Sequence, residues 1–188
     1  MSKNIIICGV GGQGTVLAAK VISQSAIANG ERVLSAETIG MAQRGGSVVS
    51  HVRIGSDIFS PLVPQGQADV LIAFEAAEAV RNIEYLKKGG TVVVNQKVVQ
   101  PVTASLSGKA FDCNTMIDFL KTKAENVVVV DTDKACEELG SSKVANIVLL
   151  GAASRAGILS RDELKAAIKQ LVKPDFYELN VRALEWSK

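Results

Sequence analysis

The sequence from residue 4 to residue 14 is Asn-Ile-Ile-Ile-Cys-Gly-Val-Gly-Gly-Gln-Gly, and it is the strongest indication of the fold. Its first five residues are mostly β-branched and have no polar face, which is typical of a strand covered on both sides. Its remainder is a glycine-rich turn of the form G-x-G-x-x-G. Residues 15–29 then predict a helix that Gly30 is well placed to end. Residues 32–37 predict a second strand, so the chain opens like a βαβ unit.

The middle of the chain predicts further strands, one of them unusual. Residues 47–54 alternate and place four side chains on one face: Val48, Ser50, Val52 and Ile54. This segment is expected to be an irregular or antiparallel insertion in the sheet. Three other apolar runs predict buried strands: 69–74, 91–95 and 127–131. A helix is expected over 75–87, ended by Gly89 and Gly90.

Helices are expected to dominate the last part of the chain. The segment from Ser160 to Glu163 has the S-x-x-E pattern of a capping box. An apolar stripe with helical spacing follows it: Leu164, Ala167, Ile168 and Leu171. We therefore predict one α/β domain over residues 1–188, a Rossmann-like three-layer sandwich with a mostly parallel sheet, an antiparallel or irregular insertion and a helical C-terminus.

Composition excludes several classes of protein. The 21 basic and 19 acidic residues give a net charge of +2 without a concentrated basic face, which argues against nucleic-acid binding. No apolar run approaches the roughly 18 residues of a membrane helix, and no signal-peptide pattern is present, so a cytoplasmic protein is expected. The three cysteines are widely spaced and His51 is the single histidine. This set is too small to hold an iron–sulfur cluster or a zinc ion alone.

The glycine motif permits more than one interpretation. Glycines let a backbone approach a ligand, and the free N–H groups of a helix N-terminus favour a phosphate. Glu37 lies 23 residues after Gly14, about where a dinucleotide-binding protein places its ribose-binding acid. An NAD(P)-binding dehydrogenase is therefore one alternative, and a non-catalytic module for a phosphate-bearing ligand is another. The glycines are also compatible with a purely structural turn.

A second block makes the motif more specific. Residues 40–55 are Gly-Met-Ala-Gln-Arg-Gly-Gly-Ser-Val-Val-Ser-His-Val-Arg-Ile-Gly. Together with Gln13 in the fifth place of the glycine motif, this block resembles the gamma subunit of pyruvate:ferredoxin and related 2-oxoacid:ferredoxin oxidoreductases. It is most similar to the beta subunit of the indolepyruvate branch. The resemblance extends over nearly all of the chain, including the turn at 61–64 and the helical region at 146–151.

The resemblance implies a small subunit that binds no cofactor alone and is inactive without a large partner. That partner would hold thiamine diphosphate, Mg and [4Fe–4S] clusters. The complex would decarboxylate a 2-oxoacid oxidatively, with coenzyme A as co-substrate and ferredoxin as electron acceptor. Apolar surface meant for the partner would also allow a homodimer of the isolated chain.

Two groups of residues are candidates for this function. The glycine loop is expected to contact an anion such as a coenzyme A phosphate: Gly9, Gly11, Gly12, Gln13 and Gly14. The second block is expected to face the partner or the shared active site: Gln43, Arg44, Gly45, Gly46 and Ser47. Arg44 suits a carboxylate or phosphate, although an ordinary ion pair is an equal alternative. Structural roles are expected for Cys8, Glu37, His51 and Asn146, and no metal site or catalytic residue is assigned.

Overall fold

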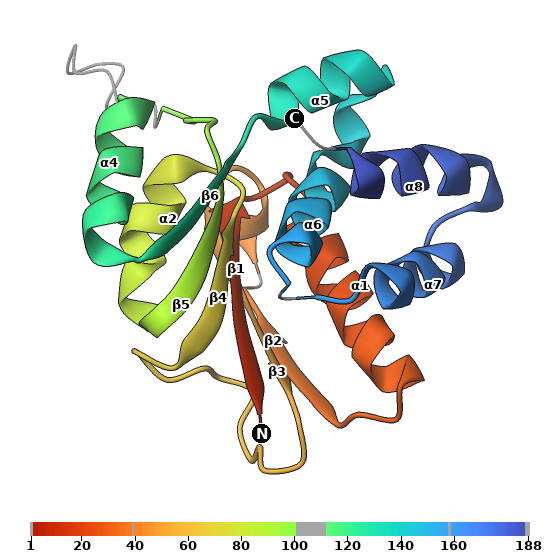
Figure 1. Ribbon diagram of the computed structural model, residues 1–188, viewed down its shortest axis with the longest axis horizontal. Coiled ribbons are helices and arrows are strands. Elements are labelled where there is room, and N and C mark those ends of the chain that lie inside the picture. Colours follow the sequence, from red (N-terminus) through yellow and green to blue (C-terminus); the bar gives the residue numbers. More distant parts are fainter. Residues whose placement is uncertain (1, 39, 101–111, 158, 187–188) are drawn as a thin grey trace.

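The computed structural model of the protein describes residues 2–38, 40–100, 112–157 and 159–186. Its strands are β1 (Lys3–Val10), β2 (Val33–Glu37), β3 (Ser47–Ile54), β4 (Ala68–Ala73), β5 (Leu86–Asn95) and β6 (Asn126–Val130). They form one sheet of six strands in the order β2-β3-β1-β4-β5-β6 (Figure 1). β3 runs antiparallel to both of its neighbours, whereas β1, β4, β5 and β6 pair in parallel. The predicted mostly parallel sheet with an antiparallel insertion is confirmed.

Helices cover both faces of this sheet (Figure 1). They are α1 (Thr15–Ala28), α2 (Ala76–Asn82), α4 (Cys113–Lys123), α5 (Thr132–Leu139), α6 (Ala145–Arg155), α7 (Arg161–Leu171) and α8 (Tyr177–Glu185). α2 and α4 pack on one face, and α1, α6, α7 and α8 pack on the other. Within the described ranges, no helix is both long enough and apolar enough to span a membrane.

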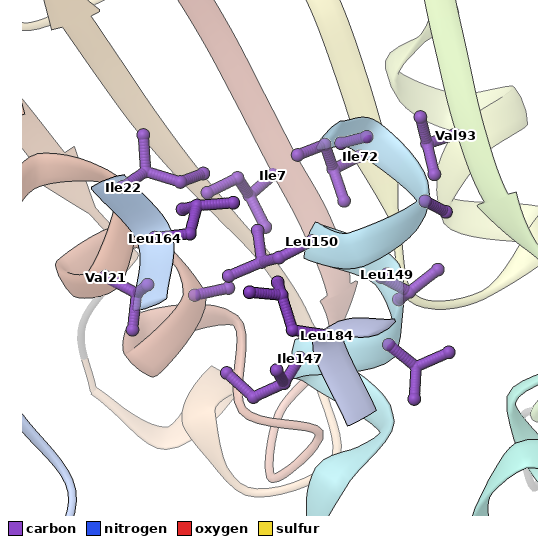
Figure 2. Packing of buried hydrophobic residues seen from close by; sticks show 14 of the residues in the cluster. Ile7, Val21, Ile22, Ile72, Val93, Ile147, Leu149, Leu150, Leu164 and Leu184 are labelled. Atoms are coloured by element: carbon purple, nitrogen blue, oxygen red, sulfur yellow. The ribbon is translucent and has the colours of Figure 1, made fainter. Parts of the chain in front are cut away.

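β1 lies in the middle of the sheet and separates two apolar clusters. Ile5 and Ile7 join the cluster beneath α1 and α6, while Ile6 and Cys8 join the one beneath α2. Figure 2 shows Leu150 of α6 close to Ile7, where side chains of α7 and α8 also gather. Burial on both faces explains why this strand has no polar side chain between Asn4 and its end.

The predicted helix over 75–87 is too long. α2 ends at Asn82, a 3-10 turn follows, and β5 begins at Leu86 instead of residue 91. Gly89 and Gly90 therefore lie inside a strand. Gly89 has a φ of 75°, and the β4–β5 register shifts beside this segment. Because glycine adopts positive φ without strain, the pair allows a strand irregularity here and does not end a helix.

The N-cap role of Ser160 in the predicted capping box is confirmed, and the stripe behind it is shorter than predicted. The Ser160 side chain accepts the N–H of Glu163 at 3.5 Å. Leu164, Ala167 and Ile168 are buried, but Leu171 is 38% exposed. α7 thus buries only its first two turns against α1 and α8.

We expect Gly151→Ala to destabilise the fold, because α6 and α8 touch at this position. A Cβ on Gly151 would lie 2.2 Å from the carbonyl oxygen of Leu184, a backbone atom that moves only with its helix. The free energy of unfolding, measured by urea denaturation, should fall by about 1–3 kcal/mol. Ala156→Ser at the exposed end of α6 is the control and should change it by less than about 0.5 kcal/mol. Equal losses in the two variants would contradict this packing.

Candidate functional site

The glycine loop joins β1 to α1 at the carboxyl edge of the parallel strands. Ligands of open α/β sheets bind at this edge. Gly12 has a φ of 100° and Gly14, the N-cap of α1, has a φ of 92°. No side chain of the described residues caps α1, so the first N–H groups of this 14-residue helix are available to a ligand.

Gly11 is used for packing against the second block. A Cβ on Gly11 would lie 2.3 Å from the carbonyl oxygen of Ala42. The Gly11 N–H donates to the carbonyl of Gly46 at 2.8 Å, and the Gly45 N–H donates to the carbonyl of Gly11 at 3.2 Å. The loop of residues 40–47 therefore lies directly on the glycine loop. In dinucleotide-binding proteins a pyrophosphate lies close to the backbone at this position. Here the 40–47 loop of the chain itself occupies that position.

Gln13 closes the glycine loop from inside. Its Oε1 accepts the N–H of Val10 at 2.8 Å, and its own N–H donates to the Val10 carbonyl at 3.2 Å. A Cβ on Gly9 would lie 2.6 Å from this Oε1 and 2.8 Å from the Cβ of Phe74. Gly9, Gly11 and Gln13 thus build the loop. Of the five residues predicted to contact a ligand, Gly12 and Gly14 are the two whose N–H groups have no backbone acceptor in the described part of the chain.

A hollow of about 440 Å³ opens beside Gly12 and Gly14. We call it the edge hollow. Its polar walls come from the glycine loop, the end of β5, the start of α5, the turn before α6 and the first turn of α6: Gln13, Asn95, Lys97, Thr132, Asp133, Ser142, Lys143 and Asn146. The hollow thus combines residues that are distant in sequence but meet at one edge of the sheet.

Asn146 places an amide donor in the edge hollow. Its side chain is only 4% exposed, and its Oδ1 accepts the N–H of Ile147 at 2.9 Å. Nδ2 has no acceptor among the described residues and lies 3.1 Å from where a Cβ of Gly14 would be. The prediction of a structural amide stays a prediction for Nδ2. Since no buried side-chain nitrogen or oxygen of the described residues lacks a partner, Nδ2 must reach the hollow, where water or a ligand can accept its hydrogen bond.

The charges around the edge hollow favour an anion. Lys97 pairs with Asp133 at 2.8 Å, and both side chains are about half exposed or more. Lys143 has no ion pair within the residues that the structure describes. Two ammonium groups against one carboxylate, together with the N-terminus of α1, give a positive local field.

Sequence reasoning missed the lysines and Thr132. They lie more than 80 residues after the glycine loop, and no local motif marks them. The signal available in the sequence was the position of Asn95 and Thr132 at the ends of two strands: Asn95 ends β5 and Thr132 follows β6. Because the carboxyl ends of parallel strands meet at one edge, both could have been placed near the glycine loop.

Glu37 does not lie beside the glycine loop. β3 is inserted between β1 and β2, so two strand spacings of about 4.8 Å separate their ends. Glu37 instead lines a separate hollow of about 180 Å³ with His51 and Leu62. Glu37 is therefore not in place to be the ribose-binding acid that the dehydrogenase alternative requires.

Part of the 40–47 loop is exposed: Gln43, Arg44, Gly45 and Ser47. Gln43 lines a second hollow of about 450 Å³ beside Gly11, Gly12 and Gly14, and its Nε2 donates to the carbonyl of Thr38 at 3.0 Å. No ion pair involves Arg44 in the described part of the chain. The Ser47 hydroxyl donates to Glu78 at 2.6 Å.

His51 and Cys8 both have structural surroundings. His51 Nδ1 accepts the N–H of Val63 at 3.1 Å, and its ring meets Tyr85 edge-on with centroids 5.5 Å apart. Burial lowers the pKa of His51. Burial, and then the charges of Glu78 and Glu75, raise the pKa of the Cys8 thiol well above its ordinary value, so this thiol is protonated at neutral pH and unreactive.

Comparison with known proteins gives one consistent family. Residues 4–186 match the sequence profile of the family described as Pyruvate ferredoxin/flavodoxin oxidoreductase. Indolepyruvate oxidoreductase subunit IorB of Thermococcus kodakarensis is 39% identical over 188 residues, which cover 97% of this chain and 92% of the relative.

Solved structures share the fold. The gamma subunit of a keto/oxoacid ferredoxin oxidoreductase from Geobacter sulfurreducens matches with a TM-score of 0.68 and 26% identity, covering 97% of this chain and 94% of that one. A 2-oxoglutarate:ferredoxin oxidoreductase from Magnetococcus marinus matches with a TM-score of 0.70 and 21% identity. The match covers 98% of this chain but only 30% of that one, so the same fold is one part of a larger chain there.

Protonation of His51 is expected to destabilise the fold. Its folded pKa lies below the ordinary value of 6.5, so its contribution to stability is fully present above that pH. As the pH falls through 6.5 and then through the lowered folded pKa, the unfolded chain takes up the proton first and the contribution is lost. His51→Gln keeps an acceptor without titrating, so its free energy of unfolding should depend less on pH over this range. Parallel pH curves for the two proteins in urea denaturation would count against this role.

Proposed function

The chain belongs to the pyruvate ferredoxin/flavodoxin oxidoreductase family, and we propose that it is the small subunit of a thiamine-diphosphate-dependent 2-oxoacid:ferredoxin oxidoreductase acting on indolepyruvate or another aryl pyruvate. One observation carries the proposal. A relative named as an indolepyruvate oxidoreductase subunit matches 97% of this chain at 39% identity. The match is therefore to a subunit, and the chemistry requires a second polypeptide.

The roles proposed for the two subunits follow from the residues that this chain contains. The complex converts a 2-oxoacid and coenzyme A into an acyl-CoA and carbon dioxide, and two electrons pass to ferredoxin. In the complex, thiamine diphosphate with its Mg ion would supply the decarboxylation chemistry, and iron–sulfur clusters would supply electron transfer. Cluster ligation takes about four cysteines, and this chain has three on separate elements. We assign these groups to the large partner.

The proposed role of the small subunit is to bind the acyl acceptor. Coenzyme A carries several phosphate groups, and the edge hollow offers ligands for one of them. We assign the N–H groups of Gly12 and Gly14, Asn146 Nδ2 and the Lys143 ammonium to this phosphate. The 2-oxoglutarate:ferredoxin oxidoreductase of the same fold is described with coenzyme A and succinyl-CoA bound, which supports acyl-acceptor chemistry in such assemblies.

The exposed segment of the 40–47 loop is proposed to face the large partner. Met41 is 78% exposed, and Gln43 and Arg44 extend beside it into solvent. An exposed apolar side chain flanked by an unpaired guanidinium is typical of an interface anchor with a polar rim. The same surface is available for a homodimer of the isolated chain.

Reconstitution tests the proposed function. The isolated chain should reduce no acceptor, and adding the large subunit should give turnover of indolepyruvate that depends on coenzyme A and ferredoxin. The isolated chain should also show no thermal shift with NADH. Oxidation of a metabolite by the chain alone, or tight binding of NADH, would contradict the proposal and restore the dehydrogenase alternative.

The assignment of the edge hollow makes a separate prediction. Lys143→Ala removes a charged partner of the phosphate and should raise the apparent KM for coenzyme A by about tenfold or more in the reconstituted complex. The KM for the 2-oxoacid should stay within about twofold. Lys134→Ala removes an exposed lysine of α5 that does not line the hollow, and it should leave both constants unchanged. Equal KM values in the two variants would show that the phosphate binds elsewhere.

A further inference from the structure

We propose that Glu78 is a positioning residue, which holds the 40–47 loop against the glycine loop through the hydroxyl of Ser47. The inference rests on the proposed function, because it assigns the consequence of this contact to coenzyme A binding. The contact itself is a property of the isolated chain and is testable without turnover.

The two buried carboxylates at the start of α2 make different contacts. Glu75 and Glu78 are each 1% exposed, and carboxylates are rarely so buried unless they are partnered. Glu75 is the N-cap of α2 and accepts the N–H of Glu78 at 2.8 Å and that of Val99 at 3.2 Å. The helix start is therefore capped without the Glu78 side chain. Within α2, Glu78 has Arg81 as the partner of one carboxylate oxygen, and its second oxygen is left for a contact outside the helix.

The Glu78 side chain is directed at the 40–47 loop. Its Oε2 accepts the hydroxyl of Ser47 at 2.6 Å, and its Oε1 pairs with Arg81, whose side chain is 51% exposed. The short distance is typical of a charge-assisted O–H···O bond. The charges of both α2 carboxylates also act on Cys8, near the end of β1. Glu78 thus lies beneath the junction of the two loops.

A short chain of contacts leads from Glu78 to the ligand-facing amides. Ser47 follows Gly46, whose carbonyl accepts the Gly11 N–H at 2.8 Å. Gly11 precedes Gly12, one of the two glycines assigned to the phosphate. Loss of the Ser47 bond leaves the start of β3 held by its backbone pairing with Val10, without the side-chain contact to α2. We expect the Gly11 contact to weaken and the glycine loop to shift as a result. A shift of this kind weakens phosphate binding without removing any group that touches it.

Hydrogen exchange on the isolated chain tests the contact. Ser47→Ala should speed exchange of the Gly11 and Gly45 amides by about tenfold or more, and Ser47→Thr, which keeps the hydroxyl, should restore protection. Ser56→Ala is the matched control, because Ser56 also donates to a carboxylate, that of Asp57, at 3.2 Å. It lies past the end of β3, at the opposite edge of the sheet. Unchanged exchange in Ser47→Ala would overturn the inference whether or not the complex turns over.

Kinetics of the reconstituted complex test the consequence. The apparent KM for coenzyme A should rise about tenfold in Ser47→Ala, return to within about twofold in Ser47→Thr, and stay unchanged in Ser56→Ala. Glu78→Gln keeps an acceptor for Ser47 and provides a second variant with a smaller expected effect. Faster exchange with an unchanged KM would reduce Glu78 to a stabilising residue and overturn the positioning role. Absence of turnover with the wild-type chain would instead refute the proposed function.

Discussion

The backbone of Gly11 lies against the backbone of Gly45 and Gly46, joined by two hydrogen bonds of 2.8 and 3.2 Å. Side chains are excluded at Gly11 and Gly46, since a Cβ on either residue would meet backbone atoms of Ala42 within 3 Å. This contact fixes the shape of the glycine loop and ties the start of β3 to the start of α1. The rest of the carboxyl edge, including the edge hollow, is arranged around it.

The same contact changes what the glycine motif means. In a dinucleotide-binding fold the second glycine leaves room for a pyrophosphate, whereas here that room is filled by the chain. β3 also takes the place beside β1 that the second strand of a dinucleotide-binding fold occupies. The motif retains a helix N-terminus and two glycines with positive φ. This helix N-terminus with its two glycines suits a single phosphate group and not a whole dinucleotide.

Local signals in the sequence were sufficient for the first strand, the glycine turn, α1 and the N-cap of α7, because each depends on neighbours within a few residues. They failed where long-range pairing decides. Gly89 and Gly90 resemble a helix stop, but pairing of β5 with β4 makes them part of a strand. The sequence spacing places Glu37 close to the glycine loop, but β3 lies between β1 and β2 and separates the two. The proposed donor role of Asn146 depends on its neighbour Gly14, which is 132 positions away in the sequence.

We propose that this chain binds a phosphate-bearing acyl acceptor at the edge hollow while another polypeptide holds the redox groups. The decisive experiment is a structure of the reconstituted complex with coenzyme A bound. We expect a phosphate within hydrogen-bonding distance of Asn146 Nδ2 and the Gly12 and Gly14 amides. Coenzyme A phosphates held entirely by the large subunit, with only water in the edge hollow, would contradict it.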